Sequence, residues 1–120
     1  MIQPSLRERY GQMDWPQQLG NLASTMARLS SRCSRPQYDD LVISLLREAA
    51  LLIEWSASHT PSAIHPDLAA MQREVLAWRR HWPLDEARTI LALRARQMSE
   101  ALLRTAGLSP IPQARRETQA

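Results

Sequence analysis

Apolar residues recur along this chain at alternating intervals of four and three residues, which is the spacing of one face of an α-helix. The first two runs consist of Trp15, Leu19, Leu22, Met26, Leu29 and Cys33, and of Tyr38, Val42, Leu45, Ala49, Leu52 and Ser56. The next two consist of Ile64, Leu68, Met71, Val75, Trp78 and Trp82, and of Ala87, Leu91, Arg94, Met98, Ala101 and Thr105. Because no alternating strand pattern accompanies them, the sequence predicts an all-α domain of four helices.

Capping residues and prolines indicate where these helices begin and end. Asp14 and Gln17 have the spacing of a capping box at the start of the first helix. Pro83 ends the third helix, and Asp85 is placed to act as the N-cap of the fourth. Gly107 is placed to adopt the left-handed conformation that closes the fourth helix.

Connections of a few residues favour antiparallel neighbours, so the four helices predict an up-down-up-down four-helix bundle. We expect residues 14–108 to form this domain, and residues 109–120 to be a flexible tail. Residues 1–13 are expected to be a mobile arm, unless Met13 is the true start of the protein. The side chains expected in the core include Leu19, Leu22, Met26, Leu45, Ala49, Leu52, Met71, Val75, Leu91 and Met98.

Composition adds limits on location and chemistry. The 120 residues suffice for one domain, and all 15 basic residues are arginine, which excludes lysine Schiff-base chemistry. The single cysteine, Cys33, cannot form an intramolecular disulfide. There is neither a signal-peptide pattern nor a run of about 18 apolar residues, so we expect a cytoplasmic protein without a membrane span.

The residue types that carry chemistry lack the spacing of known sites. His59, His65 and His81 do not fall at zinc-ligand intervals, and no glutamate is followed three residues later by histidine, as a di-iron bundle requires. There is no Gly-x-Ser-x-Gly motif, and three glycines are too few for a glycine-rich phosphate loop. We therefore expect no catalytic residue, metal or cofactor, and nothing in the sequence identifies an enzyme.

Two features point instead to an interaction surface. Trp55 lies at the border of the apolar face of the second helix, where its ring either covers the edge of the core or meets a partner. The first helix has a second face of small residues that includes Gly20, Ser24 and Ala27. Small side chains allow close approach of another helix, which is either a neighbour in the bundle or part of a second subunit.

The leading hypothesis is therefore a non-enzymatic module for protein interaction or self-association. The alternative is a protein that binds a small ligand or a nucleic acid through its tryptophans and surface arginines. Arg73 and Arg80, on the outer face of the third helix, are the arginines that best support a basic surface.

Arg94 lies in the middle of the apolar arc predicted for the fourth helix. A guanidinium buried without a partner is costly to desolvate, so it should pair with a carboxylate, extend to solvent or lie at an interface. Within the chain, Glu48 on the second helix is the best-placed carboxylate. We therefore expect a buried Glu48–Arg94 pair.

Three segments resemble a family of short, uncharacterised, all-helical proteins of cyanobacteria. They are Trp15 with Leu19-Gly20, then Leu45-Leu46-Arg47-Glu48 with Ile53-Glu54-Trp55, and finally Trp78-Arg79-Arg80-His81-Trp82. The resemblance implies a bacterial, cytoplasmic setting, and it assigns no functional residue.

Overall fold

The computed structural model describes residues 5–108, and within that range the chain is helical and contains no strand. The five α-helices are α1 (Leu6–Gly11), α2 (Trp15–Arg32), α3 (Asp39–Ser56), α4 (His65–His81) and α5 (Arg88–Ala106). Single turns of 3₁₀ helix, which precede the last three helices, span Pro36–Tyr38, Ser62–Ile64 and Asp85–Ala87. The predicted all-α class is confirmed, with four long helices packed together.

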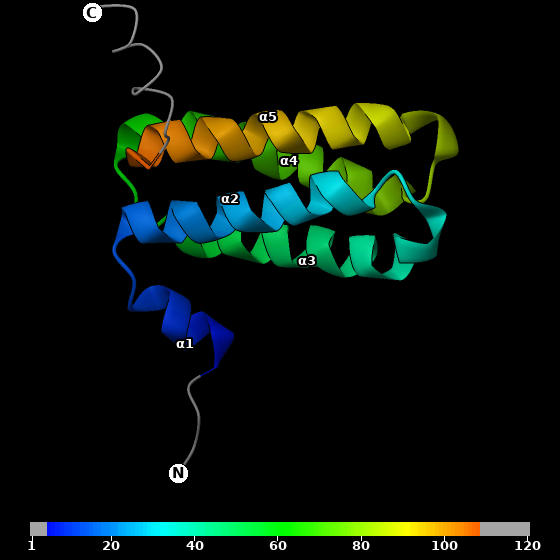
Figure 1. Cartoon of the computed structure of the whole chain (residues 1–120). Helices are drawn as coiled ribbons and strands as arrows, with labels where there is room; N and C mark the ends of the chain where they lie inside the picture. Colours follow the sequence, from blue (N-terminus) through cyan, green and yellow to red (C-terminus); the bar gives the residue numbers. More distant parts are fainter. Residues whose placement is uncertain (1–4, 109–120) are drawn as a thin grey trace, which may run out of the picture.

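Helix α2 is central to the packing, because it lies against both α3 and α5. Helix α3 also packs against α4, whereas α4 and α5 approach each other less closely. In Figure 1 the α2–α3 and α4–α5 connections lie at one end of the long helices and the α3–α4 connection lies at the other. The core is therefore built around α2 and α3, and α4 is the least enclosed of the long helices.

The predicted helix ends are confirmed at α2 and at the end of α5. The Asp14 carboxylate accepts a hydrogen bond from the Gln17 backbone N–H at 2.9 Å, and Gln17 completes the capping box. Gly107 has a φ of 75°, and the Leu108 N–H donates to the Leu103 carbonyl at 2.8 Å, which closes α5. The prediction for Asp85 was wrong, because this residue lies in the preceding 3₁₀ turn and does not cap α5.

The predicted core is confirmed except at Met71, which is half-buried. On α5, however, the buried face is rotated from the predicted arc. Its buried residues are Arg88, Leu91, Ala95, Met98, Ser99 and Leu102. Short side chains on this face allow α5 to lie close to α2, where the Ser99 hydroxyl donates to the Ala23 carbonyl at 2.8 Å.

The predicted mobile arm was wrong for residues 5–13. Ser5 and Glu8 form a capping box that begins α1, and this helix packs against α3. Tyr10 is 1% exposed, and its hydroxyl donates to the Gln18 carbonyl at 2.7 Å and contacts the Ser56 hydroxyl. A buried aromatic ring thus holds α1 on the bundle. The rest of the predicted arm, residues 1–4, and the predicted tail, residues 109–120, lie outside the described residues.

Candidate functional site

A groove of about 500 Å³ runs between α4 and α5. Its apolar lining includes Ile64, Leu68, Met71, Met98, Ala101 and Leu102. Most of these residues belong to the stripes that the sequence pattern assigns to the core. Parts of both stripes therefore line this groove, although Leu68, Met98 and Leu102 are themselves buried.

The packing of the neighbouring helices explains why the groove is open. Small residues draw α5 toward α2, while α4 packs against α3, so the two helices are held apart. Only Leu68 and Val75 of α4 are fully buried, and Met71 is half-buried beside the groove. Helix α4 thus retains apolar side chains that are only partly covered.

An ion pair bridges the groove. The Nε and Nη2 atoms of Arg94 donate to the two carboxylate oxygens of Glu74, each at 2.9 Å, and Nη1 donates to Gln97 at 2.8 Å. The hydrogen bonds to Glu74 raise the pKa of Arg94. The Arg94 side chain is 43% exposed and that of Glu74 is 29% exposed. The bridge therefore remains accessible to a partner.

This geometry overturns the predicted buried Glu48–Arg94 pair. The Glu48 carboxylate accepts hydrogen bonds from Thr25 at 2.7 Å and from Arg28 at 3.1 Å, both on α2. The rotation of α5 turns Arg94 toward α4, whereas Glu48 on α3 faces α2. Glu48 therefore pairs with Arg28 on the neighbouring helix α2, and Arg94 pairs with Glu74 on the neighbouring helix α4.

The seam between α4 and α5 opens again beyond the ion pair. A second cavity of about 140 Å³ lies near the α4–α5 connection. Its lining is almost wholly apolar and includes Trp78, Trp82, Leu84 and Leu91. Open space therefore flanks the Glu74–Arg94 bridge on both sides.

The arginine that is buried in the bundle is Arg88. Its guanidinium donates to both Asp39 oxygens at 2.7 and 3.0 Å, to Asp85 at 2.8 Å and to the Cys33 carbonyl at 3.1 Å. It also lies over the Trp82 ring, 4.9 Å from the ring centre. These hydrogen bonds raise the pKa of Arg88 and lower that of Asp39. A buried arginine therefore does pair with carboxylates in this protein. The residue is Arg88, which was not part of the arc predicted for the fourth helix.

The thiol of Cys33 lies next to this cluster and is buried. Burial raises the pKa of the thiol, so little of the nucleophilic thiolate is present at neutral pH. This environment does not favour covalent catalysis by Cys33.

Trp55 is half-buried, and α1 covers part of its ring. The Tyr10 ring lies 6.1 Å from it, and the Arg7 guanidinium lies 5.9 Å from its centre. The ring thus contacts residues of its own chain. Whether its exposed part meets a partner stays a prediction.

On the small face of α2, Gly20 lies next to the side chain of Leu108, which belongs to the same chain. A Cβ atom there would lie 2.9 Å from Cδ1 of Leu108, which follows α5. Ser24 and Ala27 are exposed, and the Ser24 hydroxyl donates to the Gly20 carbonyl. The proposal that these two residues meet a second subunit stays a prediction.

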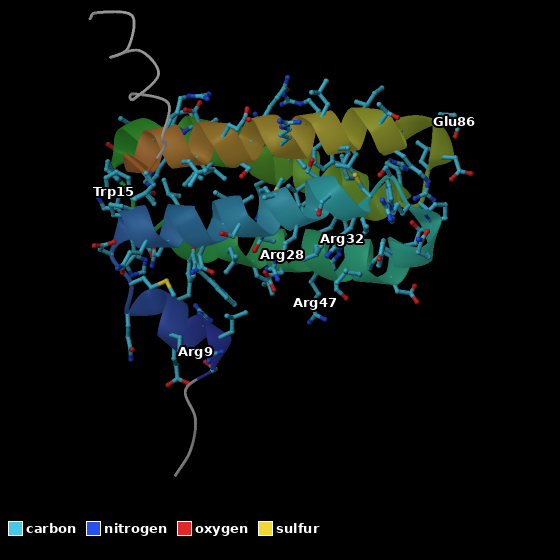
Figure 2. All side chains as sticks on the ribbon, in the orientation of Figure 1. Arg9, Trp15, Arg28, Arg32, Arg47 and Glu86 are labelled. Carbon is cyan, nitrogen blue, oxygen red and sulfur yellow. The ribbon has the colours of Figure 1, made fainter. Side chains whose placement is uncertain are left out.

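The predicted arginines Arg73 and Arg80 are exposed on α4, and neither is ion-paired with a described residue. Figure 2 shows other arginines on the side of the molecule formed by α1, α2 and α3, including Arg9, Arg28 and Arg47. Arg28 is paired with Glu48, which reduces the net charge of this region.

Within residues 5–108, no three histidine, cysteine or acidic side chains are grouped to hold a metal ion. None of the helices in that range combines the length and apolar character needed to cross a membrane. Comparisons with protein-family models, curated proteins and solved structures find no match.

Proposed function

We propose that this protein is a non-enzymatic interaction module that binds a helical surface of a protein partner along the α4–α5 groove. The observation that carries the proposal is the convergence of apolar residues from α4 and α5 on one groove. Partner helices commonly dock by laying an apolar face into such a groove.

The groove has the character of a helix-binding site. Met71 and Met98 line it from opposite walls, and methionine side chains adapt readily to different partner surfaces. The polar groups that accompany them, Glu74 and Arg94, are held in a defined geometry by their mutual hydrogen bonds. Apolar walls would supply the binding energy, and the ion pair would orient the partner.

The experiment compares three forms of the full chain immobilised on beads: wild type, Ala101→Arg and Ala57→Arg. Ala101 lines the groove, while Ala57 is an exposed alanine that follows α3, lies outside the groove lining and serves as the matched control. Proteins retained from an extract of the native cell by wild type and by A57R, but lost with A101R, would support the proposal. Identical retention by all three forms would contradict it. Circular dichroism checks that helicity is unchanged.

The proposal also covers the order of the four long helices and the cellular location. We infer an up-down-up-down order for the four long helices, which the short connections between them support. A bacterial cytoplasm is the setting implied by the resemblance to cyanobacterial proteins, and the single buried cysteine is compatible with a reducing compartment.

Binding of nucleic acid is the alternative function, and the arginines of α1, α2 and α3 favour it (Figure 2). Titration with mixed DNA and RNA at low and high salt tests it. Affinity that falls steeply with salt and is weakened by Arg47→Glu would favour this function over the groove. A small ligand in the cavity beside Trp78 and Trp82 would instead change the tryptophan fluorescence without a steep salt dependence.

A further inference from the structure

We propose that the partner in the α4–α5 groove is a second copy of this chain, docked about a two-fold axis parallel to the helices. This inference rests on the proposed function of the groove and names its occupant. It follows from the distribution of charge on the two walls.

The two walls of the groove carry opposite charges. Asp67 and Glu74 line the α4 wall, and Arg94 and Arg104 line the α5 wall. A two-fold axis parallel to the helices would place α4 of one copy opposite α5 of the other. Each acidic wall would then meet a basic wall.

The positions along the helices agree with this arrangement. Asp67 is in the first turn of α4 and Arg104 is in the last turn of α5, and both line the same groove. An axis parallel to the helices keeps this end of one copy beside the same end of the other. Asp67 would therefore face Arg104 of the second copy.

The alternative two-fold axis lies in the interface and is perpendicular to the helices. That axis would place α4 against α4 and α5 against α5, so walls of like charge would meet. Like charges at a protein interface oppose binding. The charge pattern therefore selects the parallel axis.

The Glu74–Arg94 bridges of the two copies would meet near the axis. Within each bridge the two charges are already paired in their own chain, and both side chains retain exposed surface. In the proposed dimer the four charges would alternate in sign around the axis. Such an arrangement orients the two copies without leaving an unpaired charge.

The dimer would also cover apolar surface that is exposed in one copy. Ile90 is 62% exposed and Leu93 is 54% exposed on α5. They precede Arg94 and Gln97 by one helical turn, so they extend the α5 side of the groove. A second copy on this face would cover both side chains.

The expected interface is small. Helix α4 has 17 residues. At ~1.5 Å per residue and a width of ~10 Å, two such helices present a footprint of roughly 500 Å² per copy. This area lies at the low end of specific interfaces. We therefore expect a dimer that dissociates on dilution.

The first test measures the mass of the full chain by light scattering and sedimentation from low to high micromolar concentration. Wild type should change from monomer to dimer. Asp67→Arg should remain monomeric, because it places like charges opposite each other, and the double variant Asp67→Arg with Arg104→Glu should recover the dimer. Asp40→Arg is the matched control, since Asp40 is an exposed aspartate in the first turn of α3. This control should dimerise as wild type does.

The second test determines which two-fold axis relates the two copies. Ala70 and Ala101 line opposite walls of the groove. Under mild oxidation, a mixture of Ala70→Cys and Ala101→Cys chains should form a mixed disulfide dimer more readily than either variant alone. Preferential A70C–A70C crosslinks would indicate the perpendicular axis and overturn this arrangement.

Other outcomes separate this inference from the proposed function. A wild type that stays monomeric at high micromolar concentration overturns the second-copy inference, while groove-dependent capture of another protein would leave the proposed function standing. A dimer that Ala27→Arg dissociates and Asp67→Arg does not would place the interface on α2 and also overturn the inference. A monomer without groove-dependent capture contradicts both.

Discussion

The guanidinium of Arg88 and the carboxylate of Asp39 form a two-point hydrogen-bonded pair that joins the start of α5 to the start of α3. The side chain of Arg88 is 11% exposed. The pair thereby connects helices that α2 separates over most of their length. It also closes the end of the bundle at which α2 terminates.

Asp39→Asn should lower the midpoint of thermal unfolding by several degrees, because it leaves Arg88 without its full complement of carboxylates. Glu100→Gln is the control, since it breaks the exposed Arg96–Glu100 pair on α5 and should change the midpoint little. Equal effects of the two substitutions would show that the Arg88–Asp39 pair contributes no more than a surface pair.

The same pair should make stability sensitive to acid. Arg88 lowers the pKa of Asp39 in the folded protein. The pair's contribution is therefore complete above the pKa of an unfolded aspartate, about 3.9, and is lost as the pH falls through the lower folded value. Urea unfolding measured over this range should show a smaller loss of stability in D39N than in wild type. Parallel pH profiles would contradict the assignment.

Tyr10 should account for a loss of stability at alkaline pH. Burial raises the pKa of Tyr10 to about 12. Because the pKa of Tyr10 is raised in the folded protein, its protonated hydroxyl contributes fully to the free energy of unfolding below the unfolded pKa of about 10. This contribution is lost as the pH rises through about 12. Tyr10→Phe should remove this part of the pH dependence, as measured by urea unfolding at neutral pH and between the two pKa values.

Substitutions at Tyr10 also measure how firmly α1 is docked. Tyr10→Phe loses the hydrogen bond to the Gln18 carbonyl and should cost about 1 kcal/mol at neutral pH. Tyr10→Ala removes a buried ring and should cost about 3–5 kcal/mol. A loss below about 1 kcal/mol for Y10A, on the scale of an exposed substitution, would mean that α1 does not contribute to the fold.

The close approach of α2 and α5 should tolerate no larger side chain at Ala95, which is fully buried. Ala95→Leu should destabilise the protein by about 1–3 kcal/mol in urea unfolding, because the helices must separate to admit it. Ala27→Leu, an exposed substitution on α2, should change stability by about 0.5 kcal/mol or less. Comparable losses from both would place the tight contact elsewhere.

A double-mutant cycle should give Glu74 and Arg94 a coupling of about 0–1 kcal/mol, since both side chains are partly exposed. The measurement is urea unfolding at low protein concentration, where the proposed dimer is dissociated. Glu48 and Arg94 should be additive, because Glu48 is paired with Arg28. A large Glu48–Arg94 coupling energy would support the pair predicted from the sequence and contradict the Glu74–Arg94 pair.

The positions of the four long helices and some of their ends were predictable because their causes are local. The four-and-three spacing identifies the face of each helix, and the Asp14–Gln17 capping box and the Gly107 closure depend on residues a few positions apart. Of the ten residues expected in the core, all but Met71 are buried. Short-range geometry is encoded within one turn of the chain, so the sequence pattern contains it.

Helix α1 was missed because its signal is short. It has six residues, too few for an apolar periodicity to appear. The Ser5–Glu8 capping box was the available signal, and Tyr10 is the only buried residue within α1. Its docking depends on Gln18 and Ser56, which come from two other helices.

The pairing of charges and the open groove depend on how the helices rotate and how closely they approach. An apolar arc on α5 has the same spacing whether it faces a core or a groove. Ala95 and Ser99 turn α5 toward α2 only because the backbone of α2 fits against them. That rotation places Arg88 against Asp39 and Arg94 against Glu74, each pair far apart in the sequence. Periodicity locates a helix face, but only packing between helices determines what that face meets.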